Sequence, residues 1–127
     1  MQHFSKLKVW VKAHELNIGV CRVTKAFPNW ARYTVAAQLL RCASSVPANI
    51  VEGTACSSDR ETARYLVIAR RSAAETEYFL LMAKDIELLS QDEYTKLTAL
   101  TVETQRMLNT FISTLQRASP NSHNRRP

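Results

Sequence analysis

Apolar side chains recur every three or four positions along most of the chain, which is the spacing of one face of an α-helix. This period predicts four helices, at about residues 5–26, 32–52, 58–89 and 91–117. Short breaks between long helices make neighbouring helices antiparallel. We therefore expect an all-α, up-down-up-down antiparallel four-helix bundle over residues 1–117, followed by a disordered basic tail over residues 118–127.

The predicted boundaries depend on residues that begin or end helices. Phe27 precedes Pro28, and the residue before a proline is pushed out of helical backbone angles. Gly53 can adopt the left-handed conformation that closes a helix. Ser58 is a candidate N-cap, with Glu61 three residues later as in a capping box.

Two of the predicted helices carry more apolar surface than one bundle core needs. In the first helix, one stripe is formed by Val9, Ala13, Leu16, Val20, Val23 and Phe27, and a second lies roughly opposite at Leu7, Val11, Ile18 and Cys21. In the third, the two stripes are formed by Tyr65, Ala69, Ser72, Thr76, Phe79, Ala83 and Ile86, and by Val67, Ala74, Tyr78 and Leu81. A bundle buries one stripe per helix, so the second stripes predict a homo-oligomer interface, with scattered surface hydrophobes as the alternative.

Residues 38–53, QLLRCASSVPANIVEG, form the most distinctive segment. Pro47 lacks a backbone donor, so the helix should kink or restart there. We interpret Asn49 and Glu52, on one face near the helix end at Gly53, as a polar clasp to neighbouring helices. The negative end of the helix dipole opposes the Glu52 carboxylate, so a cation or backbone amide should partner it; the candidate cations are Arg41, Arg70 and Arg71.

The composition suits one domain without disulfide or metal support. The chain has 127 residues, 46% hydrophobic and 22% charged, with two glycines. Cys21, Cys42 and Cys56 lack Cys-x-x-Cys spacing, so we expect reduced, core-type side chains. No apolar run reaches the roughly 18 to 20 residues that cross a bilayer. We therefore expect a cytoplasmic protein without a membrane partner.

We expect no catalytic, cofactor or metal site, and hence no enzyme. Glu52 has no second acid, histidine or metal ligand at a useful spacing, so it offers no route to hydrolysis. His3, His14 and His123 show no metal-ligand spacing. His14 lies on the apolar face of the first predicted helix and is expected to pack there, whereas His3 and His123 fall in terminal segments.

Charge is unevenly distributed along the chain, whose net charge is +6. Residues 1–51 hold seven Lys or Arg and one acid, residues 52–103 hold six bases and ten acids, and residues 104–127 hold four bases and no acid. A basic excess attracts polyanions such as RNA by releasing their counterions. A solvated surface that keeps the protein soluble is the alternative.

If RNA is bound, several cationic residues are candidates for phosphate contacts: Lys6, Lys8, Lys12, Arg22, Lys25, Arg32, Arg41, Arg125 and Arg126. Lys8, Lys12 and Arg22 lie near one side of the first predicted helix, as a surface that follows a phosphate backbone requires. No aromatic platform is evident in the sequence, so specificity would come from RNA shape.

Three stretches match a known pattern. The first helix and its turn match at Phe4, Leu7, Val9, Trp10, Ala13, Leu16, Phe27 and Pro28. The distinctive segment matches at Gln38, Leu39, Arg41, Ala43, Ser45, Pro47, Ala48, Asn49, Ile50, Glu52 and Gly53, and the third helix matches at Leu66, Ile68, Ala69, Ser72, Glu75 and Glu77. Over about residues 4–115 the chain thus resembles the small four-helix-bundle family associated with intervening sequences in 23S ribosomal RNA genes.

Three positions depart from that family pattern. Leu40 stands where many members have a second basic residue, Arg71 replaces a glycine before Ser72, and Ala31 lies in a turn that is often acidic. The changes at Ala31 and Arg71 make the surface more basic or bulkier, whereas Leu40 removes one positive charge. A nucleic-acid surface carries over from the family only in part.

The resemblance implies a homo-oligomer, a ring of five copies. The chain is also similar in architecture to the accessory variability proteins of diversity-generating retroelements, which implies nucleic acid and a reverse transcriptase as partners. Two functions remain open: an RNA-associated oligomeric bundle, or an interaction scaffold that docks a protein such as a reverse transcriptase.

Overall fold

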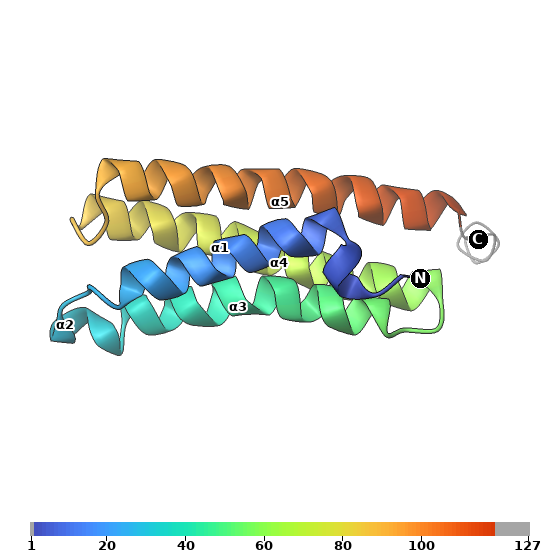
Figure 1. The fold of residues 1–127 in the computed structure, drawn as a ribbon, viewed down its shortest axis with the longest axis horizontal. Coiled ribbons are helices and arrows are strands. Elements are labelled where there is room, and N and C mark those ends of the chain that lie inside the picture. The colour runs from blue at the N-terminus through green and yellow to red at the C-terminus, as the bar shows by residue number, and fades with distance from the viewer. Residues whose placement is uncertain (1, 119–127) are drawn as a thin grey trace, which may run out of the picture.

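The computed structural model describes residues 2–118, which form an all-helical antiparallel bundle (Figure 1). Its elements are the short 3-10 turn η1 (Phe4–Lys6) and the helices α1 (Lys8–Thr24), α2 (Asn29–Arg32), α3 (Val35–Thr54), α4 (Asp59–Asp85) and α5 (Gln91–Ala118). The expected all-α class and four-helix architecture are confirmed. Residues 119–127, most of the predicted tail, lie outside the described residues.

The four long helices form a square in cross-section. α3 packs against α1 and α4, and α5 packs against the same two helices, so α1 and α4 occupy opposite corners. Figure 1 shows α1 in front, α4 behind it, α5 above and α3 below. The outer faces of α1 and α4 therefore point to opposite sides of the bundle.

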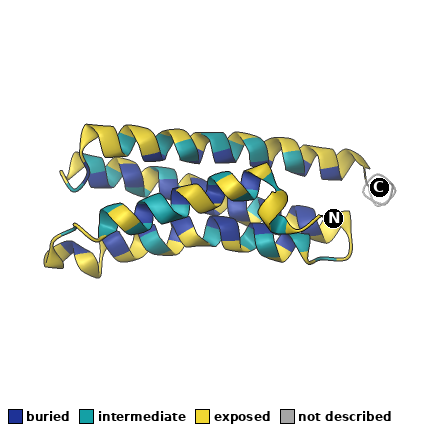
Figure 2. Ribbon diagram, in the orientation of Figure 1, coloured by how far each residue is buried: buried dark blue, intermediate teal, exposed yellow. Residues whose placement is uncertain are grey.

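The core follows the apolar period of the sequence. Val9, Ala13, Leu16 and Val20 of α1 are all buried, as predicted. They face fully buried side chains on the other three helices, among them Leu39, Ile50, Leu66, Leu80 and Leu108. Each such leucine contributes about 1.5 to 3 kcal/mol through removal of its apolar surface from water. In Figure 2 the exposed residues of α5 lie on its upper, outer side, and its buried and intermediate residues lie on the side that faces the other helices.

Buried threonines also lie between the helices. The Thr76 hydroxyl donates to the Ser72 carbonyl at 2.8 Å, and the Thr101 hydroxyl donates to the Leu97 carbonyl at 2.7 Å. Each hydroxyl thus satisfies its hydrogen bond within its own helix, which removes most of the cost of its burial. These threonines can therefore lie in the apolar core without a hydrogen bond to another helix.

The second predicted helix has different ends from those expected. α3 begins at Val35 and continues through Gly53 to Thr54, and the separate short helix α2 precedes it. Among the described glycines none has a positive φ, so the left-handed stop predicted at Gly53 is wrong. Gly53 instead permits close packing: a Cβ there would lie 3.3 Å from the Thr62 carbonyl oxygen and from the Tyr65 Cβ. The Thr62 hydroxyl donates to the Gly53 carbonyl at 2.8 Å.

The restart of the helix considered at Pro47 does not occur. α3 is one helix from Val35 to Thr54, with Pro47 inside it. Pro47 is buried, and so are Val46 and Ile50 on the same side of the helix. This packing against the neighbouring helices offsets the loss of one backbone hydrogen bond.

The capping expected at the start of α4 is confirmed. The Ser58 hydroxyl accepts from the Glu61 backbone N–H at 3.2 Å. The next helix, α5, has a complete capping box: the Glu93 N–H donates to the Ser90 hydroxyl at 3.1 Å, and the Ser90 N–H donates to the Glu93 carboxylate at 2.9 Å. α4 itself ends at Asp85, before the predicted boundary, and Glu87 in the following turn has a φ of 67°.

The cysteines are unpaired, and they differ in burial. Cys42 is fully buried, whereas Cys21 and Cys56 are half-buried. Burial raises the pKa of the Cys42 thiol. The expected core role is therefore confirmed for Cys42. Over residues 2–118, no helix is both long and apolar enough to cross a membrane.

Candidate nucleic-acid interface

The predicted clasp at the end of α3 has different members from those expected. Asn49 Nδ2 donates to the Ser45 carbonyl at 2.8 Å and to the Ser45 hydroxyl at 2.9 Å. Ser45 Oγ lies 2.8 Å from Ser72 Oγ of α4, so the polar link between α3 and α4 runs through the serines. Glu52 is exposed, and its carboxylate has no hydrogen bond or ion pair among the described residues. The clasp role assigned to Glu52 is wrong because the Glu52 side chain faces away from the neighbouring helices.

Two of the three arginines proposed to partner Glu52 have other contacts. Arg41 pairs with Glu75 of α4 at 2.8 Å. Arg70 donates to Asn109 Oδ1 of α5 at 3.0 Å. Arg71 is exposed. Arg41 therefore links α3 to α4, and Arg70 links α4 to α5.

The prediction that His14 packs on the apolar face of the first helix is wrong. His14 is exposed, and its ring stacks on that of Trp10 with the centroids 4.7 Å apart and the planes 8° from parallel. The side of α1 that carries His14 is therefore outside the core. Within residues 2–118, no three His, Cys, Asp or Glu side chains gather in a way that would hold a metal ion.

Most of the described candidates for phosphate contacts are exposed, but they are spread over different parts of the bundle. Lys6, Lys8, Arg22, Lys25, Arg32 and Arg41 are exposed, and Lys12 is half-buried. Lys12 approaches Glu15 at 4.0 Å, and Arg41 is paired with Glu75, so carboxylates partly neutralise both cations. Arg125 and Arg126 lie outside the described residues.

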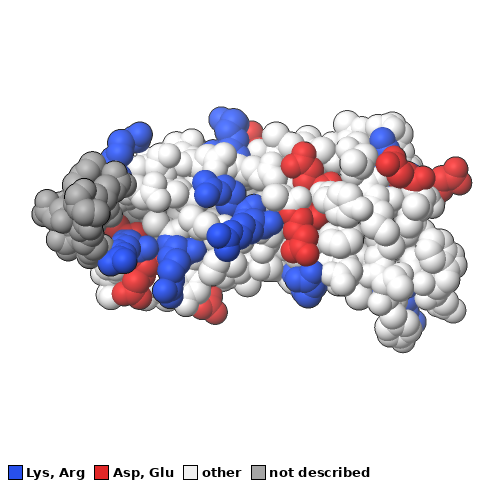
Figure 3. Space-filling view, turned by 180° about the vertical axis from the view of Figure 1, so that it is seen from behind, with Lys and Arg blue, Asp and Glu red and all other residues white. Residues whose placement is uncertain are grey.

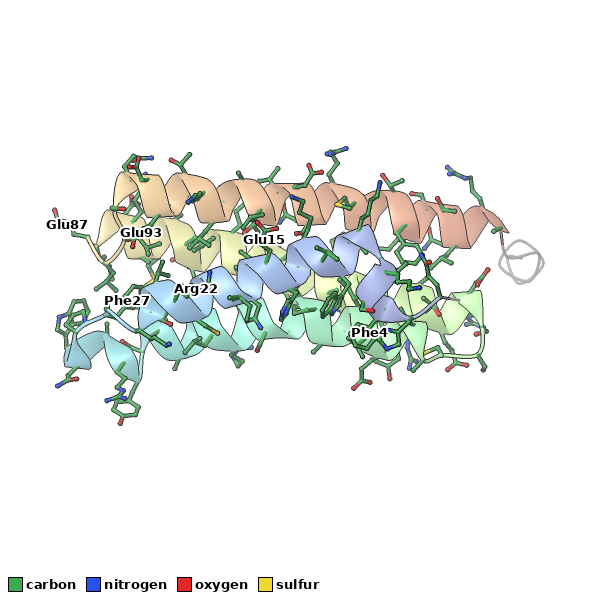
Figure 4. All side chains as sticks on the ribbon, in the orientation of Figure 1. Phe4, Glu15, Arg22, Phe27, Glu87 and Glu93 are labelled. Carbon is green, nitrogen blue, oxygen red and sulfur yellow. The ribbon has the colours of Figure 1, made fainter. Side chains whose placement is uncertain are left out.

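Lys12 and Arg22 line a groove where α1 meets α5, which we call the α1–α5 groove. Its lining includes Val11, Ile18, Gly19, Leu97 and Leu100, the cations Lys12, Arg22 and Lys96, and the carboxylates Glu15, Glu93 and Glu103. Glu15, Arg22 and Glu93 are seen along this side of the bundle in Figure 4. Three carboxylates balance three cations here, so the predicted phosphate-following side of α1 is electrostatically mixed. Arg106, which donates to Glu103 at 2.6 Å, lowers the pKa of that carboxyl.

The outer face of α4 has a different balance. Arg60, Arg64 and Arg71 are exposed, and no carboxylate lies within 4.0 Å of any of them among the described residues. Helical spacing places the three on one face of α4, because their positions differ by four and seven residues. We call this row the α4 arginine row. Figure 3, which views the bundle from the α4 side, shows Lys and Arg gathered over one half of this face.

Sequence reasoning missed the α4 arginine row. Residues 52–103 are acidic in total, and that sum hides where each charge lies. Asp59 and Glu61 occupy the first turn of α4, where the positive end of the helix dipole stabilises carboxylates. The spacing of Arg60, Arg64 and Arg71 in the predicted helix was the signal that could have found the row.

A second cationic region lies where the end of α1, the short helix α2 and the start of α3 meet. We call this region the α2 corner. Lys25 and Arg32 line a hollow there together with Cys21, Thr24, Phe27, Asn29, Ala36 and Leu40, and no carboxylate lines it. Trp30 and Tyr33, in and directly after α2, are 62% and 84% exposed. Both rings are thus at the surface, in or directly after the short helix that also carries Arg32.

The second apolar stripes are at the surface only in part, because Leu7 and Val67 pack against the core. Val11 is 45% exposed and Tyr78 is 58% exposed, and Ala74 and Leu81 are also exposed. The other members of the second stripes, Leu7, Ile18, Cys21 and Val67, are half-buried. Because α1 and α4 occupy opposite corners, the two stripes lie on different sides of the molecule.

Comparison with known proteins places the chain in a family. The model of the 23S rRNA-intervening sequence protein family matches residues 5–110. A solved structure of a protein of unknown function from the S23 ribosomal protein family of Bacteroides thetaiotaomicron superposes with a TM-score of 0.77, at 27% sequence identity, over 82% of this chain and 97% of the other. No curated protein matches the chain. The chain belongs to the 23S rRNA-intervening sequence protein family, as its sequence resemblance predicted.

Proposed function

We propose that this protein is a non-catalytic, self-associating helical bundle that binds RNA through the α4 arginine row. The observation that carries the proposal is that Arg60, Arg64 and Arg71 are exposed, share one face of α4 and have no carboxylate partner. At a rise of 1.5 Å per residue the row extends for about 16 Å, which is long enough to contact several phosphates.

The energy for this binding comes from counterion release. Each arginine that neutralises a phosphate frees a condensed cation, and the affinity falls as salt rises. Arginines already paired with carboxylates gain less, because they must first give up that partner. The family name refers to an intervening sequence of 23S rRNA, which supports structured RNA as the polyanion.

The other candidate cations have unequal parts in this proposal. Lys6 and Lys8 at the start of the chain, and Lys25 and Arg32 at the α2 corner, remain as additional phosphate contacts. Lys12 and Arg41 do not, because carboxylates partner them. Arg22 lines the mixed α1–α5 groove, so it gains less from RNA than its exposure alone suggests.

The second apolar stripes support self-association. They lie on α1 and α4, at opposite corners of the bundle, so a stripe of one copy meets a different stripe of the next. Such head-to-tail contacts close into a ring when the rotation between copies allows it. We propose this kind of ring, with the five copies that the family resemblance implies. A monomer in solution would contradict this part of the proposal and leave the α1–α5 groove to a different protein, such as a reverse transcriptase.

Binding of the full chain to a structured RNA, measured over a range of salt concentrations, tests the proposed function. We expect binding at about 50 mM salt and a linear fall of log affinity with log salt, at a slope of roughly 0.7 to 0.9 per phosphate contact. Polyglutamate of similar length is the control, since it is also a polyanion but carries no phosphates. Absence of binding at 50 mM, or an affinity that does not change with salt, would overturn the proposal.

A further inference from the structure

The corner formed by α1, α2 and α3 has the chemistry of an anion site. Lys25 and Arg32 come from the two sides of a small hollow, are both exposed, and are not in an ion pair within the described residues. The Asn29 amide also lines the hollow and can donate hydrogen bonds. No carboxylate is among the described residues that line the hollow, so its charged side chains are both cations. This set of donors suits a phosphate group.

Two aromatic side chains in and directly after α2, Trp30 and Tyr33, lie outside the lining of this hollow and are exposed. Trp30 and Tyr33 are three residues apart, so they lie on the same side of the helical turn. Among the described residues, neither ring contacts another aromatic ring or a cation closely enough to stack. Trp10 is by contrast half-buried and stacked on His14. Large rings left in water at a cationic corner are available to a flat ligand.

The combination points to a nucleotide. A phosphate alone would not need the rings, and an apolar partner alone would not need the two cations. Proteins that bind unpaired nucleic acid combine cations on the phosphates with aromatic rings on which bases stack. Bases inside a duplex are already stacked on one another and cannot reach side chains in this way.

We propose that the α2 corner binds an unpaired segment of RNA, with Lys25 and Arg32 on a phosphate and with bases stacked on Trp30 and Tyr33. This inference rests on the proposed RNA binding and assigns different parts of the RNA to two surfaces of the protein. The α4 arginine row contacts the backbone of structured RNA, and the α2 corner captures a loop or single-stranded end.

Fluorescence offers a direct test, because the chain has only two tryptophans. In a Trp10→Phe variant of the full chain, Trp30 is the only tryptophan, and stacking of a base on its ring should quench its emission. Single-stranded oligoadenylate of ten nucleotides is the probe, and a fully paired duplex of the same length is the comparison. We expect saturable quenching by the single strand and little by the duplex. Anionic lipid vesicles form a third arm; a change with vesicles but not with RNA would overturn the proposal in favour of a membrane surface.

Variants separate this inference from the proposed function. Trp30→Leu with Tyr33→Leu should weaken single-strand affinity by roughly 10- to 100-fold and leave duplex affinity unchanged. Val102→Ala, which shortens an exposed apolar side chain of α5 outside the second stripes, is the control and should have no effect. If the wild-type chain binds neither probe, RNA binding itself fails. If it binds both probes and the double variant retains its single-strand affinity within twofold, only the α2 corner fails.

Discussion

The α1–α5 groove and the α4 arginine row each carry three basic side chains, yet they present different surfaces. In the groove, Glu15, Glu93 and Glu103 lie among the cations. Two acids further along α4 have other partners: Glu75 pairs with Arg41, and the Glu77 carboxylate accepts from the Gln105 amide at 3.1 Å. Attraction for a polyanion therefore depends on where the carboxylates lie and less on the number of cations.

The first prediction compares the inner and outer sides of α4. The packing of the inner side fixes the position of the helix and thereby of the α4 arginine row. Leu66 is fully buried, and Leu66→Ala should lower the free energy of unfolding by about 2 to 5 kcal/mol through loss of buried surface and a cavity. Ile68, two residues away, is 38% exposed, and Ile68→Ala should cost less than about 1.5 kcal/mol. Denaturant unfolding measures both. Equal losses would contradict the assignment of the two sides.

A second prediction concerns Tyr78 and Leu81, the exposed apolar side chains that follow the α4 arginine row along α4. Tyr78→Gln with Leu81→Gln makes these two positions polar, and we expect the assembly to dissociate to monomers at micromolar concentration. Sedimentation velocity measures this. Val102→Gln, at an exposed apolar position of α5 outside the second stripes, is the control and should leave the assembly intact. A wild-type chain that already sediments as a monomer would refute the interface.

The third and smallest effect concerns the charge balance on the α1–α5 side. Arg106 holds the Glu103 carboxyl in its charged form, so the pKa of Glu103 lies below its ordinary value. Arg106→Gln removes that hydrogen bond and charge, and the Glu103 pKa should rise towards its ordinary value. An NMR titration of the side-chain carboxyl measures the shift. A pKa that is unchanged by the substitution would show that the contact is not maintained in solution.

Most of the fold could be predicted from the sequence, because the bundle core depends on a simple period. Val9, Ala13, Leu16 and Val20 recur at helical spacing and are all buried. The ends of helices were harder, because tertiary contacts decide them. Gly53 has the residue type of a helix stop, yet its carbonyl accepts from Thr62 and the helix continues past it.

The candidate site was less predictable, for two physical reasons. Helical spacing places Glu52 and Asn49 near one another, but it does not show which of them faces a neighbouring helix; the structure exposes Glu52 and turns Asn49 back to Ser45. Charge summed over long segments also conceals its arrangement on the surface. The basic excess of residues 1–51 points to α1, but Lys12 of that helix lies close to Glu15.

The central claim is that the α4 arginine row contacts RNA phosphates, and two triple variants test it most directly. Arg60→Gln, Arg64→Gln and Arg71→Gln remove three positive charges from α4, whereas Lys12→Gln, Arg22→Gln and Lys96→Gln remove three from the α1–α5 groove. The net charge of both variants is the same, so only the position of the lost charges differs.

Affinity for structured RNA should be measured against salt for the wild type and both variants, after circular dichroism shows that each is folded. We predict that the α4 variant loses about 2 to 3 from the slope of log affinity against log salt and roughly 100-fold in affinity at 50 mM salt. The groove variant should keep its slope within about 1 of the wild type. Equal losses in the two variants, or a larger loss in the groove variant, would contradict the claim.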